Sequence, residues 1–304
     1  MTEEAATTGA GTSRAEALRA HLAMLGFAAL ISSSFTVGGL IASSIDPVAL
    51  TFWRFVLAGA IFLAILLATE RIPRPSAGDL GRYLVIGLHL AIYFALMFEA
   101  LRWTDPLSAG VVYTMIPAMT AVFSLIVLGQ RTSLRQMVAL VIAGAGALWV
   151  LFRADLGALA RFEVGYGEWV FLAGCVAYAA YPVAIRRLHR GESAAALTFW
   201  SLVTGTVLLA LWGFRAILDT HPFEIPAGVW LGILHLAVFS TAISFFLIKY
   251  ASLRLPGAKV MAYTFLIPAL VALLEGAIGH GWPSPAVLAG VAVTALALAV
   301  VEPG

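Results

Sequence analysis

The chain has 304 residues, of which 62% are hydrophobic and only 11% are charged, and its formal net charge is +2. Soluble domains carry about 25% charged residues, so this chain lacks the polar surface of a soluble protein and is predicted to be an integral membrane protein. Its basic residues are scattered between apolar blocks, which argues against a nucleic-acid partner. The single cysteine, Cys175, excludes an intramolecular disulfide and a cysteine-based metal site.

Residues 1–19 are polar and are predicted to form a disordered cytoplasmic tail without the pattern of a cleaved signal peptide. Apolar runs of about 20 residues, the length that spans a bilayer, follow in chain order. We expect ten such spans, at residues 20–43, 48–69, 81–103, 107–129, 134–152, 167–185, 195–215, 227–249, 257–278 and 284–301. Turn residues such as Asp46-Pro47, Asp105-Pro106 and Pro256-Gly257 separate them. The predicted fold class is therefore an all-α integral membrane protein with ten transmembrane helices.

The orientation of the spans follows from the distribution of Lys and Arg between the connecting segments. The alternate segments that include the N-terminal tail carry Arg14, Arg19, Arg71, Arg74, Arg82, Arg131, Arg135, Arg186, Arg187, Arg190, Lys249, Arg254 and Lys259. The other segments carry Arg102, Arg153, Arg161 and Arg215. This asymmetry predicts that both termini are cytoplasmic, in a bacterial-type inner membrane.

Three short sequences occur twice in the same order, at nearly constant separation. Ala49–Trp53 returns as Ala196–Trp200, and residues 88–91 (Leu-His-Leu-Ala) return as residues 234–237. The pattern Tyr-Thr followed by Ile-Pro-Ala occurs at residues 113–118 and again at 263–269. We therefore expect two repeats of five spans, residues 20–152 and 167–301, joined by an outer loop at 153–166. Because five is odd, the second repeat enters the membrane from the opposite side, and the repeats are inverted.

Inverted repeats are typical of secondary transporters, in which the substrate site lies near the membrane midplane between the two halves. The order and spacing of several weak motifs resemble the drug/metabolite transporter superfamily, specifically its EamA-type members. These motifs include Pro47 to Arg54-Phe55, Gly110 to Ala118, and Pro256-Gly257 to Ala269. The resemblance is strongest to bacterial exporters of amino acids and aromatic metabolites. Two positions where the family often has Glu carry Gln130 and His280, so no acidic role is carried over to them.

Ionisable and aromatic residues inside the spans are the candidate substrate-binding groups. His89 and His235 each lie about 12 Å from the start of their helices, at about 1.5 Å per residue, and either line a central cavity or bond a neighbouring helix. Tyr93 and Phe239 follow them by four residues and are expected on the same helix faces. The other predicted substrate-binding residues are Tyr113, Tyr178 and Tyr263. We predict a lining suited to an apolar or aromatic solute, and no bound metal or cofactor.

Two prolines at matching positions of the repeats, Pro117 and Pro268, are expected to kink their spans and act as hinges together with Gly110. Two charged residues, Arg54 and Glu99, are assigned structural roles. Arg54 lies inside the second span and is expected to pair with Glu99 or to extend toward the outer surface. Small residues at spacing four, among them Ala139, Ala143 and Ala147, predict close helix contacts. The partner helix could belong to a second copy of the chain, so a homodimer is one of the expected arrangements.

The sequence favours a secondary transporter that exports small organic solutes, chiefly aromatic or other apolar amino acids and related metabolites, by alternating access. A multidrug or amphiphilic-cation efflux carrier, or another metabolite carrier of the same fold, is the alternative. A channel and an intramembrane enzyme are remote alternatives, because neither charged pore rings nor a catalytic motif stands out in a span. The expected partners are a small-molecule substrate and the lipid bilayer.

Overall fold

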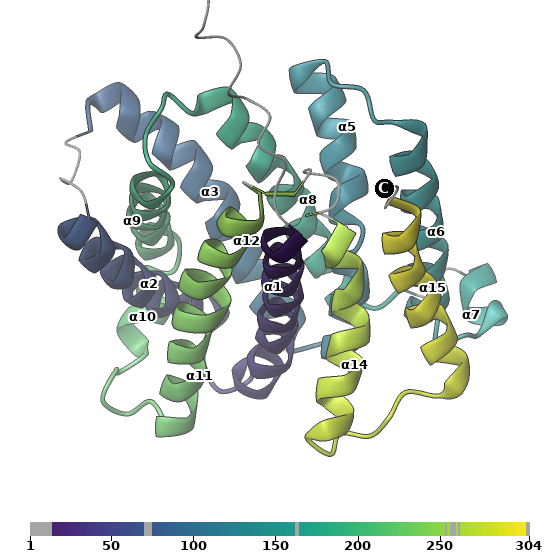
Figure 1. Cartoon of the computed structure of the whole chain (residues 1–304). Helices are drawn as coiled ribbons and strands as arrows, with labels where there is room; N and C mark the ends of the chain where they lie inside the picture. Colours follow the sequence, from purple (N-terminus) through teal and green to yellow (C-terminus); the bar gives the residue numbers. More distant parts are fainter. Residues whose placement is uncertain are drawn as a thin grey trace, which may run out of the picture.

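Figure 1 shows the computed structural model, which describes residues 14–69, 75–161, 164–252, 254–255, 260 and 262–301. The described part of the chain contains helices and no strand. Its first half forms α1 (Arg14–Ile41), α2 (Pro47–Thr69), α3 (Ala77–Ala100), α4 (Pro106–Tyr113), α5 (Ile116–Leu128) and α6 (Leu134–Leu151). The second half begins with the short α7 (Leu156–Arg161), followed by α8 (Tyr166–Leu188), α9 (Ala194–Trp212) and the short α10 (Phe214–Asp219). It continues with α11 (Ala227–Ala237), the π-helix η1 (Val238–Ile243), α12 (Ser244–Ser252), the 3₁₀ helix η2 (Tyr263–Leu266), α14 (Ile267–Ala277) and α15 (Pro285–Val301).

Eight helical stretches are long and apolar enough to cross a membrane, which indicates a multi-pass membrane protein. They are Ala15–Ile41, Pro47–Thr69, Ala77–Ala100, Pro106–Leu128, Leu134–Leu151, Tyr166–Leu188, Ala194–Trp212 and Ala227–Ser252. Two further apolar helices, Tyr263–Ala277 and Pro285–Ala297, are shorter than the length expected of a span. Ten helical regions thus coincide with the ten predicted segments, while the number of actual crossings and the inverted relation of the halves remain predictions.

Turn residues place the helix starts where the sequence predicted breaks. Proline is the first residue of α2, α4 and α15, a position where its missing N–H costs no helical hydrogen bond. Asp105 caps α4, because its carboxylate accepts a hydrogen bond from the Ser108 N–H at 2.9 Å. One boundary differs from the prediction: α1 begins at Arg14, so residues 14–19 of the predicted disordered tail are helical. These residues favour helix intrinsically and carry Glu16 in the first turn, where a negative charge stabilises the helix dipole. Residues 1–13 lie outside the described part.

Helix α1 lies near the middle of the bundle in Figure 1 and contacts α4, α11, α12 and α14. Helix α3 packs against α8 and α9, α2 packs against α9, and α5 packs against α8. Helices α6 and α15 form a separate pair at one side of the bundle. The main core includes Phe35 of α1, whose ring lies edge-on to Tyr113 of α4 and Phe171 of α8 at centroid distances of 5.7 and 5.8 Å.

Small residues permit the closest helix contacts, as the sequence predicted. A Cβ atom at Gly87 of α3 would lie 2.5 Å from the Ser201 carbonyl oxygen of α9. A Cβ atom at Gly146 of α6 would overlap the Thr294 hydroxyl of α15 and lie 2.7 Å from the Gly290 carbonyl oxygen. The predicted small-residue face of α6 therefore packs against α15 of the same chain.

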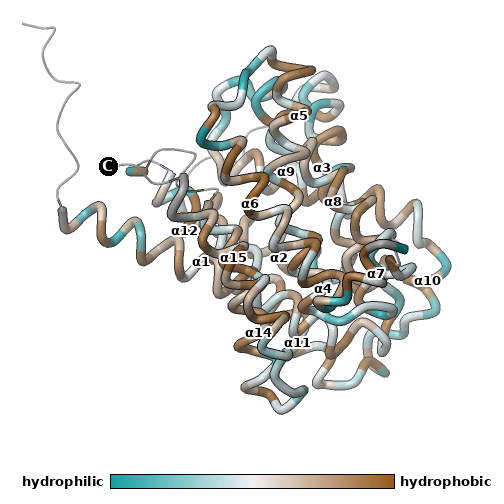
Figure 2. Tube along the Cα trace, turned by 90° about the vertical axis from the view of Figure 1, so that its right-hand side faces the viewer, coloured by the Kyte–Doolittle hydropathy of each residue, from teal (hydrophilic) through white to brown (hydrophobic). Residues whose placement is uncertain are grey.

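Hydrophobic residues occur along most of the helices (Figure 2), and many of them are exposed on the outside of the bundle. On α5, for example, Val122, Leu125 and Ile126 are 55%, 52% and 72% exposed. Soluble monomers rarely expose such contiguous apolar surface. These side chains therefore provide the contact with lipid tails that a membrane-spanning helix requires.

Candidate functional site

A partly enclosed cavity of about 180 Å³ lies within the bundle. Its walls come from α1, α2, α3, α4, α5, α8, α9, η1, α12 and η2, so that both halves of the chain contribute. Most of the lining is apolar or aromatic, and hydroxyl groups and one guanidinium provide its polar part. The residues that carry these polar groups or aromatic rings are Phe27, Ser34, Arg54, Tyr93, Phe94, Tyr113, Thr120, Tyr178, Tyr181, Ser240, Thr241, Ser244, Phe245 and Thr264. An apolar pocket with a few convergent polar groups is the usual form of a small-molecule site.

Three of the predicted substrate-binding tyrosines come together in this cavity. Tyr93 of α3 stacks on Tyr178 of α8 with their ring centroids 4.3 Å apart, and the ring of Tyr113 of α4 lies 6.2 Å from that of Tyr178. Tyr181 continues the stack on Tyr178 at 5.7 Å. The cluster forms one aromatic wall of the cavity from three helices.

Neither predicted histidine lines the cavity. The Nδ1 atom of His89 lies 2.7 Å from the Val85 carbonyl oxygen of its own helix, and Leu90 rather than His89 shares the cavity face with Tyr93 and Phe94. The physical reason is helix geometry: at about 3.6 residues per turn, Leu90, Tyr93 and Phe94 share one face of α3, whereas His89 is rotated about 40° beyond Tyr93, away from that face. His235 bonds a neighbouring helix, the second of the two roles predicted for it, through Nε2 to the Ser33 hydroxyl at 2.9 Å.

The two remaining predicted residues lie outside the cavity lining. Phe239 stacks on His235 at 5.1 Å and is 44% exposed on the surface of the bundle. Tyr263 is buried, and its hydroxyl lies 2.7 Å from Nδ1 of His21 on α1. The neighbour of Tyr263, Thr264, contributes to the cavity instead.

The predicted hinge residues lie at breaks in the helices. The chain forms turns at Thr114 and Met115 between α4 and α5, and Pro117 is at the start of α5. Pro268 occupies the same position in α14, directly after the 3₁₀ turn η2. Each proline lacks the N–H that would continue the helix. Gly110 lies against the second break, because a Cβ atom there would be 3.8 Å from the Cα atom of Pro268. The structure thus brings Gly110 and Pro268 together, and Pro117 lines the cavity.

The structure contradicts the predicted pairing of Arg54 with Glu99. Its side chain is 1% exposed and lines the cavity instead of extending to the surface or pairing with Glu99. The Glu99 carboxylate instead accepts hydrogen bonds from Trp103 Nε1 at 2.9 Å and from Arg102 Nη1 at 3.1 Å. Arg54 Nε and Nη2 donate to the Thr241 hydroxyl at 3.2 and 2.9 Å.

The π-helix η1 explains how Thr241 reaches Arg54. The Thr241 hydroxyl donates to the Leu236 carbonyl oxygen five residues earlier, at 2.9 Å, while it accepts from the guanidinium. A π turn is wider than an α turn and commonly occurs at functional sites. Ser240 and Ser244 of the same segment also line the cavity. In the sequence, this segment appears as hydroxyl residues, Ser240, Thr241 and Ser244, inside an apolar span. The α-helical period does not predict which of them face the cavity, because the helix locally has a π turn.

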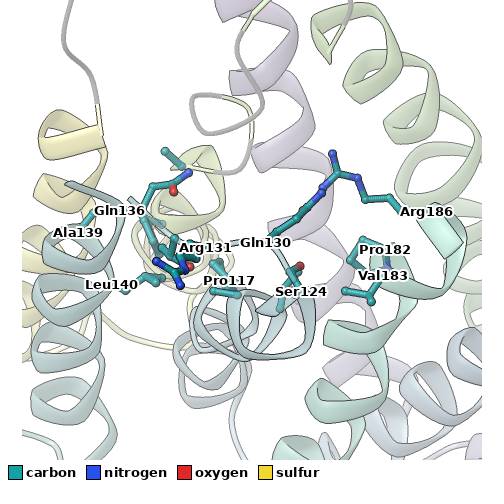
Figure 3. A pocket seen from close by; sticks show the side chains of 15 residues that line it. Pro117, Ser124, Gln130, Arg131, Gln136, Ala139, Leu140, Pro182, Val183 and Arg186 are labelled. Atoms are coloured by element: carbon teal, nitrogen blue, oxygen red, sulfur yellow. The ribbon is translucent and has the colours of Figure 1, made fainter. Parts of the chain in front are cut away.

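A second, open cavity of about 480 Å³ adjoins the first, since Pro117, Thr120 and Pro182 line both. We call this open cavity the vestibule. Figure 3 shows Arg131 and Gln136 on one side of it and Pro182, Val183 and Arg186 on the other. The Oε1 atom of Gln130 accepts a hydrogen bond from Arg186 Nη1 at 2.6 Å. The vestibule leads from the surface near α5, α6 and α8 to the central cavity.

The fold defines a multi-pass helical membrane protein with an internal cavity. The profile of the EamA-like transporter family matches residues 18–152 and 165–302, and the chain belongs to this family. It is 24% identical over 264 residues to the uncharacterized transporter YyaM of Bacillus subtilis, covering 86% of this chain and 87% of that protein. It is also 22% identical over 234 residues to an uncharacterized transporter of Archaeoglobus fulgidus, covering 75% and 78%. A solved crystal structure shares the fold with a TM-score of 0.66 and 22% identity, covering 94% and 96%.

Proposed function

We propose that this EamA-family transporter is a secondary transporter that exports small organic solutes, chiefly amino acids with aromatic or apolar side chains and related metabolites. It acts by alternating access between two inverted repeats in a bacterial-type inner membrane with both termini in the cytoplasm. The observation that carries the proposal is the aromatic cavity inside the bundle, which shares lining residues with the vestibule. An internal cavity that adjoins a more open one supports this proposal, because a carrier holds its substrate site near the midplane between its two halves.

The size and the lining of the cavity support a small, partly aromatic solute. A dry apolar cavity of about 150 Å³ holds one benzene ring, and the cavity here has about 180 Å³. Drug-sized ligands usually occupy pockets of about 300–1,000 Å³. The tyrosine cluster of Tyr93, Tyr113 and Tyr178 lines this cavity, where it can contact another aromatic ring. A small aromatic or apolar solute thus fits better than a bulky amphiphilic drug.

Movement between states is assigned to the two helix breaks. Pro117 and Pro268 interrupt the hydrogen-bond ladder of the fourth and ninth predicted spans. Small residues beside such breaks, here Gly110 against Pro268, allow the segments to change angle without a side-chain clash. A change at either break would alter the cavity wall, because Tyr113 and Pro117 border the first break and Thr264 precedes the second.

The test is flux into proteoliposomes of a panel of labelled solutes: aromatic and apolar amino acids, related carboxylates and amphiphilic cations. The variant Thr120→Trp places a large ring where the vestibule meets the cavity. Val122→Trp is the matched control, because Val122 is on the same helix, is 55% exposed and lines neither cavity. We expect flux with the wild type and the control variant, and loss of flux with Thr120→Trp. Flux equal to that of empty liposomes for the whole panel would overturn the proposal.

A further inference from the structure

Arg54 is a buried charge without a described counter-ion. It is 1% exposed, and no ion pair joins it to a carboxylate in the described part of the chain. Its guanidinium carbon lies 3.9 Å from the ring centroid of Phe94, a cation–π contact that offsets part of the desolvation. A buried ion normally persists only with a partner and satisfied hydrogen bonds, because desolvation of a charge is costly. The state described here therefore leaves the charge of Arg54 incompletely compensated.

The unsatisfied donor identifies where a partner would bind. Nε and Nη2 of Arg54 both donate to the Thr241 hydroxyl, while Nη1 is buried and has no hydrogen-bond partner among the described residues. Arg54 lines the cavity, so an anionic group in the cavity can approach it. A carboxylate matches this position, since its two oxygens accept from the planar guanidinium in a bidentate arrangement.

The path to Arg54 is also positive. Arg131 and Arg186 line the vestibule, and none of the described residues that line the vestibule or the cavity is Asp or Glu. A cleft lined by charges of one sign between low-dielectric walls raises the local concentration of the opposite charge. A cationic solute would meet three arginines on its way and find no described carboxylate to bind its ammonium group. The electrostatics therefore favour an anion over a cation.

The neighbours of Arg54 define the rest of the solute. Phe94 covers one face of the guanidinium, and the Tyr93–Tyr178 stack continues the same wall. The ring centroids of Tyr93 and Phe94 are 4.7 Å apart. A solute with its carboxylate at Arg54 would thus place its apolar or aromatic body against these rings.

We propose that Arg54 binds the carboxylate of the transported solute, and that the protein selects small organic carboxylates with an aromatic or apolar body. This inference rests on the proposed transport function, since it names the substrate class of the same cavity. The competing interpretation is that Arg54 only fastens α2 to η1 through Thr241. A fastening role predicts that substitution of Arg54 weakens the fold without changing which solutes bind.

The experiment measures binding to the purified full chain by isothermal titration, with phenylacetate, phenylacetamide and benzylamine as solutes that share one ring. We expect the wild type to bind phenylacetate at least about tenfold more tightly than the amide, because a charge-assisted hydrogen bond is lost with the amide. Benzylamine should bind more weakly still. Equal binding of the three solutes would overturn the inference, whatever the flux panel shows.

Two substitutions and a control separate recognition from folding. Arg54→Met should remove the preference for the carboxylate, and Arg54→Lys, which keeps the charge without the planar fork, should retain part of it. Arg102→Met is the control, because Arg102 is exposed at the end of α3 and lines neither cavity. A carboxylate preference that survives in Arg54→Met would contradict the proposal. If Arg54→Met does not fold, the proposal is tested by the carboxylate preference of Arg54→Lys and by the binding of the three solutes to the wild type. Flux without carboxylate preference would refute this inference alone, whereas selective binding without any flux would refute the transport function.

Discussion

The close contact between α3 and α9 can be tested by adding one methyl group at Gly87. An alanine Cβ there would lie 2.5 Å from the Ser201 carbonyl oxygen and 2.8 Å from the Gly205 nitrogen. Both atoms are main-chain atoms, so the helices would have to separate, and overpacking of this kind costs about 1–3 kcal/mol. Alanine also gains about 0.5–1 kcal/mol over glycine in a helix. We therefore expect Gly87→Ala to lower the free energy of unfolding by up to about 2.5 kcal/mol.

Gly81→Ala is the matched control for this prediction. Gly81 lies on the same helix, and its added Cβ atom would meet nothing within 4 Å. The control should gain up to about 1 kcal/mol from helix propensity alone. Reversible unfolding of both variants in the same detergent, compared with the wild type, measures the difference. A Gly87→Ala variant as stable as Gly81→Ala would refute the reasoning that α3 and α9 meet through main-chain atoms.

Three further outcomes are expected. Gly146→Ala should destabilise the α6–α15 pair by about 1–3 kcal/mol. Gly144→Ala on the same helix should not, because a Cβ atom there meets nothing within 4 Å. Thermal unfolding measures the difference, and equal stability of the two variants would contradict the contact. Thr241→Val removes the described acceptor of the Arg54 guanidinium and should cost about 1.5–3 kcal/mol of unfolding free energy, and an unchanged stability would contradict that role. His89→Ala should leave proteoliposome flux within about twofold of the wild type, because His89 lines neither cavity; a larger loss would place His89 in the transport path.

Much of the helical framework could be predicted from the sequence. Apolar run length and turn prolines such as Pro47 and Pro106 located the helices to within a few residues, since both signals are local. The repeated Ile-Pro-Ala sequences located both helix breaks for the same reason, because proline acts on the backbone immediately before it. The repeat relation itself, and the ten crossings, remain predictions.

The site was only partly predictable. Tyr93, Tyr113 and Tyr178 were predicted as aromatic residues inside the spans near the other candidate residues, and all three line the cavity. The residues that line the cavity next to them could not be chosen from periodicity, since the spans are apolar on all sides and show no distinct polar face. Thus Leu90, and not His89, faces the cavity.

The π-helix was the largest departure from the predicted geometry. Phe239 was placed with His235 by α-helical spacing, and the two rings do stack, but on the outer side of the bundle. The wider turn at residues 238–243 changes which side chains face inward, and it is Thr241 that meets Arg54. No local rule from composition signals a π turn, so the environment of Arg54 could be recognised only in the structure.

The most direct test of the account locates a bound solute. Crystals of the protein grown with 4-bromophenylacetate would report the ring position through the anomalous signal of bromine. The account predicts a bromine peak in the central cavity, with the carboxylate within hydrogen-bond distance of Arg54 Nη1 and the ring against Tyr93 and Tyr178. A solute bound elsewhere in the bundle, or in the cavity with its carboxylate directed away from Arg54, would contradict it.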